Sequence, residues 1–431
     1  MPRTSSPQAC GRNERRPSGA TATHRVPAVR RRIAFITTIA DTQWHFLHGQ
    51  NQFLAERGFE IHAIASPGPM LDKLMQRDGV VVHAVPMSRS IHPLRDVRAI
   101  LQLWRLLREV RPHLVHVSTP KAALVGSIAA WLAGVPARIL LLRGLALEGS
   151  TGLRRQVLRV AESVAARLCH RTLCVSRSLR EAACTEWIVN RHETAVPAQG
   201  MSNGVDGTRF DPRTVMAANL PGIGHRSIVE RPPVIGFVGR MSKDKGLDVI
   251  ADAFALVRRE FPDARLLLVG GWDESSPPAE AVRTRLERDP FVHITGAVSD
   301  PETWLKCMTV FAFASRREGF PNAPMEAAAM EVPVVATEAT GTTDAVLNGI
   351  TGMLVPQGDA TAMAGAICQY LRSPELRRRH GRAGRQRVLR EFQPERIWEA
   401  MLSEYVGLLH ERGLASPEHA VAAASPQRRA A

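Results

Sequence analysis

The sequence predicts an α/β protein in which two doubly wound, Rossmann-like domains of similar size face each other across a cleft. Short apolar runs rich in Val, Ile and Leu alternate with longer helical patterns, which is typical of parallel sheets covered by helices on both faces. The alternation lapses at 208–232, where proline, glycine and polar residues predict a linker. A length of 431 residues with 45% hydrophobic content is sufficient for two packed cores.

The first domain is expected at 31–207. Its strands are predicted from buried apolar runs, and its helices from apolar residues that recur with a period of 3.6. The strands are expected at 31–38, 60–66, 80–85, 113–118, 137–142 and 171–176, and the helices at 45–58, 93–110, 120–134, 153–168 and from 177 onward.

The second domain is expected at 233–390, with the same alternation. Its strands are expected at 233–239, 264–270, 291–296, 309–314 and 332–337, and its helices at 246–260, 278–288, 301–307, from 322 and then on toward the C-terminus. A helix at 391–412 is expected to pack back toward the first domain. Disordered tails are expected at 1–30, which is basic, and at 413–431, which is rich in Ala, Ser and Pro.

The charge is unevenly distributed along the chain. The net charge is +15, and residues 1–32 carry eight arginines against one glutamate, which is +7 of that total. A second basic concentration lies at 371–392. Such a balance is compatible with nucleic acid, an anionic membrane or phosphorylated substrates as partners, and the alternative is a solvated, arginine-rich surface.

The cysteines and the apolar runs predict a cytoplasmic protein. The six cysteines form no CxxC pair and have no histidines at ligand spacing, so they predict neither a zinc site nor a disulfide framework. The first thirty residues contain no apolar core of a signal peptide. The longest uncharged run, 122–137, is too short for the roughly 20 apolar residues of a spanning helix.

A candidate phosphate site follows the first strand of the second domain, in "GRMSKDKG". Arg240 and Lys245 project from this loop, and a helix is expected to begin near Gly246. Two cations and a helix N-terminus that converge on one place can hold a diphosphate. The glycines lack the spacing of a dinucleotide fingerprint. The alternative is two solvated loop cations.

A pair of carboxylates occurs in "EGFPNAPMEAAAMEVPVVAT", between two predicted strands. Asn322 is predicted to cap a helix, which would place Glu326 in its first turn and Glu318 in the loop before it. Both acids would then lie at the carboxyl end of a strand, where open α/β sheets bind ligands. Two acids alone could also indicate glycoside hydrolysis. The neighbouring cations argue against hydrolysis, and so does a first-turn position, which favours the ionised form rather than a proton donor.

Lys121 is a third candidate, at the start of a helix predicted in the first domain. Thr119 is expected to cap this helix, and a lysine in its first turn opposes the helix dipole unless an anion is present. An anionic ligand at this helix start is one hypothesis. A lysine whose ammonium group reaches the surface is the other.

These motifs resemble those of the retaining glycosyltransferases of family 4, which have the GT-B fold. The resemblance is carried by "VGRMSKDKG", "TGMLVPQGDATAMAGAI", "STPKAALVGSIAAWLAGVPARILLLRGL" and "SNGVDGTRFDP", and by the spacing from Glu318 to Glu326. It covers about residues 31–410. Within the family the chain is similar to enzymes of bacterial capsule, exopolysaccharide and O-antigen assembly, which implies an acceptor sugar on a polyprenyl diphosphate or an oligosaccharide acceptor.

The resemblance also implies roles for matching residues. Arg240 and Lys245 would neutralise the diphosphate of a nucleotide-sugar donor, expected to be a UDP-sugar, and would act in catalysis with Glu318, which would contact the donor sugar. Glu326 would bind the ribose. The backbone amides of Gly319, Phe320 and Asn322 would lie near the sugar and phosphate. The further candidates for substrate binding are Arg143, Asn203 and, from its place at a helix start, Lys121. The departing phosphate oxygen would assist deprotonation of the acceptor, so no metal or other cofactor is expected.

The chain departs from the family pattern in two places. Arg143-Gly144 stands in "LLRGLALEG" where many members carry His-Gly, so Arg143 would contact phosphate or the catalytic geometry would differ. The first loop, "ITTIADTQWHF", lacks the glycine pair common in the family. The acceptor pocket is therefore unassigned, with His45 as a candidate and a structural histidine as the alternative.

The helix predicted at 93–110 combines apolar residues at helical spacing with arginines. It could lie on an anionic membrane surface as a basic amphipathic helix, or it could be a core helix with a solvated basic edge. The expected function is thus that of a cytoplasmic glycosyltransferase, which would be peripheral on the membrane if this helix lies on lipid. The alternatives are a nucleotide-sugar epimerase or a phosphorylase of the same fold and, outside enzymes, a nucleic-acid-binding protein that uses the basic tail.

Overall fold

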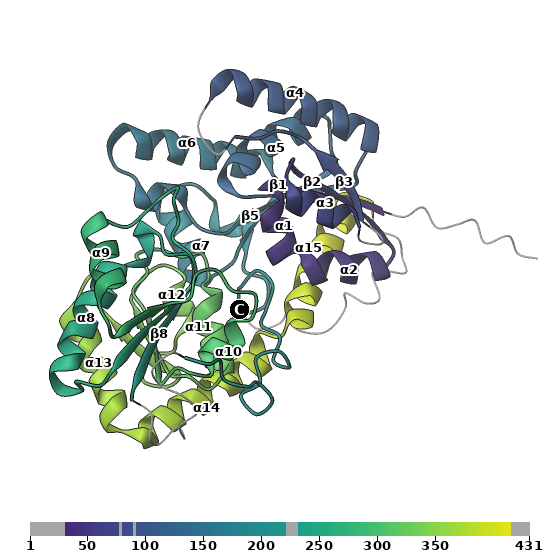
Figure 1. Ribbon diagram of the computed structural model, residues 1–431. Helices are drawn as coiled ribbons and strands as arrows, with labels where there is room; N and C mark the ends of the chain where they lie inside the picture. Colours follow the sequence, from purple (N-terminus) through teal and green to yellow (C-terminus); the bar gives the residue numbers. More distant parts are fainter. Residues whose placement is uncertain (1–30, 77–79, 89–91, 221–231, 415–431) are drawn as a thin grey trace, which may run out of the picture. The chain divides into compact units, whose positions relative to one another are not determined.

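The computed structural model describes residues 31–76, 80–88, 92–220 and 232–414. The predicted N-terminal tail, nearly all of the predicted C-terminal tail and residues 221–231 of the predicted linker lie outside these ranges. The described residues form two parallel sheets, each covered by helices (Figure 1). The predicted α/β class with two doubly wound domains is confirmed.

The first domain contains a parallel sheet with the strand order β3-β2-β1-β4-β5-β6-β7. Its core is built around the central strand β1, where Ile33–Ile36 are fully buried. The strands are β1 (Arg31–Ile39), β2 (Phe59–Ser66), β3 (Val80–Ala84), β4 (Leu114–Ser118), β5 (Ala137–Leu142), β6 (Arg171–Cys174) and β7 (Thr194–Ala195). The helices are α1 (Ala40–Phe46), α2 (His48–Glu56), α3 (Pro69–Met75), α4 (Pro93–Val110), α5 (Pro120–Leu132), α6 (Gly152–Leu168) and α7 (Arg177–Thr185), and a 3-10 turn, η1, spans Ala146–Gly149.

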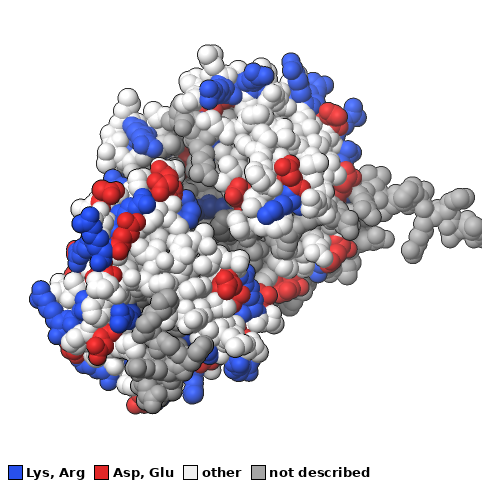
Figure 2. Space-filling view, in the orientation of Figure 1, with Lys and Arg blue, Asp and Glu red and all other residues white. Residues whose placement is uncertain are grey.

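The second domain repeats the plan with the order β10-β9-β8-β11-β12-β13, again parallel. The strands are β8 (Val234–Val238), β9 (Arg265–Val269), β10 (Val292–Ile294), β11 (Val310–Phe313), β12 (Val334–Thr337) and β13 (Gly352–Val355). The helices are α8 (Leu247–Glu260), α9 (Glu280–Arg288), α10 (Pro301–Leu305), α11 (Asn322–Ala329), α12 (Thr342–Ala345), α13 (Ala360–Arg372) and α14 (Pro374–Glu391). Charges of both signs are interspersed over this domain on the face seen in Figure 2.

The predicted strands are all found, and the differences concern short or interrupted elements. The helix expected at 45–58 corresponds to α2, and α1, which ends directly before it at Phe46, was not predicted. Other short elements that were not predicted from the sequence include α3, β7 and β13. Thr119 does not cap α5, because its hydroxyl bonds that of Thr38 at 2.8 Å.

Helix α15 (Pro394–Glu411) follows the second domain in the chain and lies against the first, beside α2 (Figure 1). Its Tyr405 is fully buried. The tyrosine hydroxyl bonds His116 Nδ1 at 2.8 Å and accepts from Gln50 Nε2 at 3.2 Å. A buried polar network therefore ties α15 to β4 and α2.

Candidate active site

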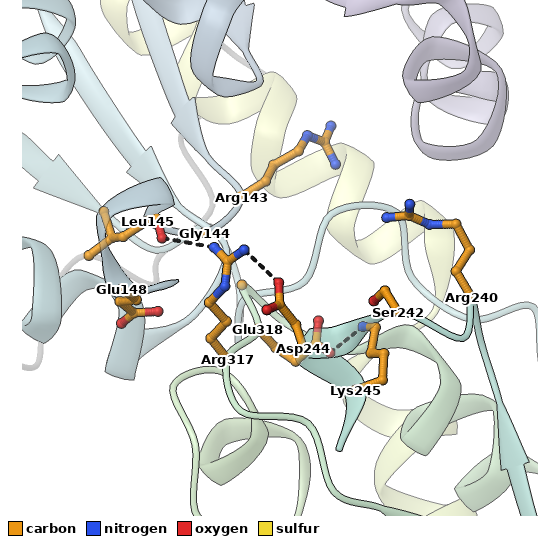
Figure 3. A pocket seen from close by; sticks show the side chains of 11 residues that line it. Arg143, Gly144, Leu145, Glu148, Arg240, Ser242, Asp244, Lys245, Arg317 and Glu318 are labelled. Carbon is orange, nitrogen blue, oxygen red and sulfur yellow. Dashed lines mark hydrogen bonds and ion pairs between the residues drawn. The ribbon is translucent and has the colours of Figure 1, made fainter. Parts of the chain in front are cut away.

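A polar pocket lies where loops from both domains meet at the carboxyl ends of their strands (Figure 3). The loops follow β5 in the first domain and β8 and β11 in the second. β8 and β11 are neighbours in the sheet but not in sequence, so this is the topological switch point, where open α/β sheets bind ligands. The pocket has a volume of about 190 Å³, and it is lined by Arg143, Gly144, Leu145, Glu148, Arg240, Ser242, Asp244, Lys245, Arg317, Glu318 and Gly319.

Two predicted site residues, Lys245 and Glu318, form an ion pair in this pocket. Lys245 Nζ donates to Glu318 Oε1 at 2.5 Å, and the hydroxyl of Ser315 donates to the same oxygen at 2.7 Å. The two side chains are only 21% and 15% exposed. A ligand that carries both an anion and hydroxyl groups could take over these partners, the anion at the lysine and the hydroxyls at the glutamate.

The position of Lys245 depends on the glycine that follows it. Gly246 has a φ of +65°, and a Cβ at this position would lie 2.2 Å from the carbonyl oxygen of Ala314. Only glycine combines this backbone conformation with this close approach. The 3-10 turn that contains Lys245 therefore passes directly into α8, and the lysine lies at the N-terminus of a 14-residue helix, where anions are favoured.

Arg240 supplies a second cation from the same loop. Its side chain is 71% exposed and forms an ion pair with Asp273. In Figure 3 it lies at the side of the pocket farthest from Glu148. The Asp273 side chain is 10% exposed, but it also accepts hydrogen bonds from the backbone and hydroxyl of Ser275, so it keeps partners when Arg240 turns to a stronger anion.

Arg317 and Asp244 also line the pocket, and neither is among the site residues predicted from the sequence. Arg317 Nη2 donates to Asp244 Oδ2 at 2.6 Å, and Arg317 Nη1 donates to the carbonyl oxygen of Leu145 at 3.3 Å. The arginine thus links a loop of the first domain to a loop of the second. Its place directly before Glu318 is a signal that could have identified it.

Glu148 is another pocket residue that was not predicted. It lies in η1, and its Oε1 accepts a hydrogen bond from the hydroxyl of Thr340 in the second domain at 2.9 Å. Burial raises the pKa of Glu148, opposed by the Thr340 hydrogen bond and by the charges of Arg317 and Arg155. The usable signal in the sequence was its position six residues after the end of β5, at the ligand-binding edge of the sheet.

Arg143 lines the pocket, but its side chain extends toward α15 rather than toward Lys245 (Figure 3). Burial lowers the pKa of Arg143 to about 10, so the guanidinium remains charged at neutral pH. Burial, together with the Arg143 charge, lowers the pKa of the neighbouring His116 to about 3, so that imidazole is neutral. The arginine predicted to contact phosphate therefore lies beside the neutral network of His116 and Tyr405.

Gly319 brings the two domains together at the pocket wall. A Cβ at this position would lie 2.0 Å from the carbonyl oxygen of Arg143 in the first domain. The hydroxyl of Ser176, also in the first domain, donates to the carbonyl oxygen of Gly319 at 2.7 Å. The glycine therefore permits a contact between the domains directly beside Glu318.

The predicted helix cap before Glu326 and its predicted place in the first turn of the helix are both wrong. Pro321 occupies the N-cap of α11, and Asn322 is the first helical residue with no capping hydrogen bond from its side chain. Glu326 is consequently the fifth residue of α11, beyond the first turn, and it is not among the residues that line the pocket. Burial raises its pKa to about 7. The argument against hydrolysis that relied on an ionised first-turn acid therefore does not hold for Glu326.

Phe320 and Asn322 also lie outside the set of lining residues. The ring of Phe320 is buried and packs against the ring of Phe392, with centroids 5.3 Å apart. Its side chain belongs to the core, and only its backbone remains available for the role that the family resemblance implied.

Lys121 has a partner within the chain. Its Nζ donates to Asp96 Oδ2 of α4 at 2.6 Å, and the two side chains are 9% and 17% exposed. The carboxylate of Asp96 supplies the negative charge that a lysine at this helix start requires. The inference of an external anion at Lys121 therefore loses its basis.

Asn203 and His45 are not among the residues that line the pocket. Asn203 Oδ1 accepts a hydrogen bond from Trp398 Nε1 of α15 at 3.1 Å, and its Nδ2 donates to the carbonyl oxygen of His45 at 3.5 Å. Asn203 thus connects α15 with the first domain. The side chain of His45 is exposed.

Two family models match the chain. Residues 47–206 match "Glycosyltransferase Family 4", and residues 232–373 match "Glycosyl transferases group 1". Among similar proteins, the capsular polysaccharide biosynthesis glycosyltransferase CapM of Staphylococcus aureus is 33% identical over 365 residues, which are 85% of this chain and 94% of that protein. The UDP-Gal:alpha-D-GlcNAc-diphosphoundecaprenol alpha-1,3-galactosyltransferase of Escherichia coli is 26% identical over 324 residues, 73% of this chain and 81% of that protein.

Solved structures share the fold. HepE from Anabaena, in complex with UDP and glucose, matches with a TM-score of 0.70 and 18% identity over 86% of this chain and 98% of its own. A glycosyltransferase from Rickettsia africae matches with a TM-score of 0.70 and 18% identity over 88% and 99% of the two chains. With two family models and the identity to CapM in agreement, the chain belongs to the glycosyltransferases of family 4 and has the GT-B fold.

Proposed function

We propose that this glycosyltransferase moves a sugar from a UDP-sugar, with retention of the anomeric configuration, to a lipid-linked or oligosaccharide acceptor in the assembly of a bacterial surface polysaccharide. The observation that carries the proposal is the pocket in which Arg240 and Lys245, at the N-terminus of α8, meet Glu318. Cations and a helix N-terminus bind a diphosphate, and a carboxylate binds sugar hydroxyls. HepE, which shares the fold, is solved with UDP-glucose.

In the proposed complex each group acts on a different part of the donor. Lys245 and Arg240 hold the diphosphate and stabilise the charge that develops on the leaving group. Glu318 leaves Lys245 and accepts hydrogen bonds from the donor sugar, beside the backbone of Gly319. Glu326 binds the ribose, and its raised pKa lets the carboxyl group donate as well as accept a hydrogen bond.

The proposed reaction is an attack by an acceptor hydroxyl on the anomeric carbon from the face that the diphosphate leaves. The bond between the anomeric carbon and the phosphate oxygen breaks, and its electron pair leaves with the nucleoside diphosphate. The hydroxyl proton passes to the departing phosphate oxygen. The protein cations balance the charge of this leaving group, so we propose that transfer requires no metal ion.

The acceptor and the location are inferred from relatives and from the cysteines. The Escherichia coli and Campylobacter jejuni relatives are named for sugars on diphosphoundecaprenol, and the Staphylococcus aureus relative for capsular polysaccharide. We propose a polyprenyl-diphosphate-linked acceptor by analogy with them. The described cysteines form no disulfide with one another, and we propose a cytoplasmic location, where thiols stay reduced.

A panel of nucleotide sugars tests the donor site. A UDP-sugar at 100 times its Kd should stabilise the protein by about 2.7 kcal/mol. Lys245→Ala should abolish this gain, whereas Lys243→Ala, which removes an exposed cation of the same loop outside the pocket, should keep it. Absence of stabilisation by any nucleotide sugar, or equal losses in the two variants, would refute the proposed donor site.

The stereochemistry and the reaction type need a product analysis. NMR of the product of an α-linked UDP-sugar should show an α linkage, and a β linkage would contradict retention. Isomerisation of the donor without an acceptor would identify an epimerase instead. Transfer that persists in the presence of a chelator would support the metal-free reaction, and loss of transfer that Mg²⁺ restores would contradict it.

We also propose that α4 lies on an anionic membrane surface. Leu94 and Val97 are 88% and 55% exposed, and Leu101 is also exposed, with arginines beside them. Leu107, farther along the same helix, is buried in the core. Basic side chains predominate around α4 in Figure 2. Within the described ranges no helix is long and apolar enough to cross a bilayer.

Flotation with liposomes tests this contact. The protein should float with vesicles that contain anionic lipid, and Leu94→Ser with Leu101→Ser should reduce the floating fraction. Met216→Ser, which removes an exposed apolar side chain elsewhere, serves as the control. Equal flotation with neutral and anionic vesicles would remove the proposal.

A further inference from the structure

The pocket contains three carboxylates, and one of them differs from the other two. Asp244 is paired with Arg317, and Glu318 is paired with Lys245. Among the residues that the structure describes, Glu148 has no cation within ion-pairing distance. Its Oε1 accepts from Thr340, while its Oε2 is buried and has no hydrogen-bond partner in the described part of the chain.

A buried carboxylate oxygen without a partner is costly, and because Glu148 lines the pocket, a ligand bound there could supply the missing donor. Burial also raises the pKa of this carboxyl group, as expected where water is scarce. A diphosphate cannot satisfy Glu148, because the two would repel each other. A neutral hydroxyl group can.

The loop around Glu148 is fixed before any ligand binds. The backbone N–H of Ala146 donates to Glu162 Oε1 at 2.8 Å, and Arg155 Nη1 donates to the carbonyl oxygen of Leu147 at 3.1 Å. Leu147 is fully buried. The two residues that precede Glu148 are therefore held in place by side chains of α6, as suits a binding residue.

The location of Glu148 separates it from the diphosphate ligands. Arg240, Lys245 and Glu318 all belong to the second domain, whereas Glu148 comes from the first. Figure 3 shows Glu148 and Arg240 at opposite sides of the pocket, with Arg317 and Asp244 between them. A donor anchored by its diphosphate at Arg240 and Lys245 would leave the Glu148 side for the molecule that attacks it.

We propose that the Glu148 carboxylate binds a hydroxyl group of the acceptor sugar. This inference depends on the proposed function, since it assumes a donor diphosphate at Arg240 and Lys245. A hydroxyl group of the donor sugar has the same chemistry, so the experiment must distinguish the two sources. Glu148 positions the acceptor by accepting a hydrogen bond and takes no part in the departure of the diphosphate.

The test compares Glu148→Ala and Glu148→Gln with Glu181→Gln, which removes an exposed carboxylate of the first domain that pairs with Arg191 outside the pocket. The acceptor probe is the pooled lipid and aqueous extract of the source cells, titrated at saturating labelled UDP-sugar. Glu148→Ala should raise the half-saturating amount of extract by about 10- to 100-fold, the value of a hydrogen bond to a charged group. Glu148→Gln should recover part of this loss, and Glu181→Gln should behave as the wild type.

Two donor measurements complete the test. The Kd of UDP-sugar and the rate of its hydrolysis without acceptor should stay within about twofold of wild type in Glu148→Ala. An unchanged half-saturating amount of extract, or an equal change in the donor measurements, would overturn the assignment of Glu148 to the acceptor. Failure of the wild-type protein to bind any nucleotide sugar would overturn the proposed function, and a wild type that binds donor but labels nothing in the extract would overturn both.

Discussion

Replacement of Glu318 by glutamine should make the enzyme bind UDP more tightly while it transfers sugar more slowly. Glu318 neutralises Lys245, the proposed ligand of the diphosphate. UDP must therefore displace the carboxylate before it can use the lysine. Glutamine keeps the size of the side chain and its bond to Ser315 but releases the charge of Lys245.

The size of the effect follows from the geometry of the pair. A hydrogen bond to a charged group contributes about 1.5–3 kcal/mol. The Lys245–Glu318 bond is short, at 2.5 Å, but both side chains are partly exposed, so we reduce this value to about 1–2 kcal/mol. UDP should then bind about 5- to 30-fold more tightly to Glu318→Gln. Transfer should fall because the donor sugar loses a carboxylate ligand.

Titration calorimetry with UDP checks the affinity, and a double-mutant cycle with Lys245→Ala checks the cause. The gain should vanish when Lys245 is absent. Asp244→Asn removes the same charge from the same pocket without freeing Lys245, so it controls for the change in the electrostatic potential of the pocket. Unchanged or weaker UDP binding in Glu318→Gln, or a gain that persists without Lys245, would refute the reasoning.

Three further predictions concern stability. Lys121→Met should lower the free energy of unfolding by about 2 kcal/mol, because it leaves the carboxylate of Asp96 without its partner, and it should not change the Kd of UDP. Urea unfolding measures the stability and calorimetry the Kd. A weaker Kd without loss of stability would restore the anion-site hypothesis. Gly49→Ala should cost about 1–3 kcal/mol, since its Cβ would lie 2.2 Å from the ring of Trp398, and a wild-type urea midpoint would contradict the described packing of α15. Burial raises the pKa of Glu162 to about 7, so the folded state holds this proton where the unfolded chain releases it, and stability should fall as the pH rises from about 4.5 through 7. Glu162→Gln should flatten that fall in urea titrations at several pH values, and an unchanged slope would show that Glu162 is already ionised.

The fold could be predicted well because its information is local. Each buried parallel strand is a continuous apolar run, as in β11 and β12, and each is separated from the next by a helical pattern. β7 has only two residues, Thr194–Ala195, which is too short for a pattern, and β13 begins with a glycine and has only two buried residues among its four. Close to the break between α1 and α2, the ring of Trp398 from α15 occupies the space beside Gly49. No local pattern in the sequence reveals this contact.

The site was predictable only in part, for a related reason. Arg240, Lys245 and Glu318 lie at strand ends, and a sequence shows where strands end. Their hydrogen-bond partners depend on tertiary structure. No local pattern in the sequence predicts the bond of Lys245 to Glu318, or the bond of Thr340 to Glu148 in the other domain. The raised pKa of Glu326 likewise arises from burial that the residues around it in sequence do not reveal.

The return of α15 to the first domain has a consequence for how the protein is made. Gln50 meets Tyr405 only after 355 further residues have been synthesised. Until then the ribosome-bound first domain exposes the apolar and polar surfaces that α15 later covers, including His116. We therefore expect the nascent first domain to recruit chaperones, and a chain truncated before Pro394 to be degraded in the cell although both sheets are complete.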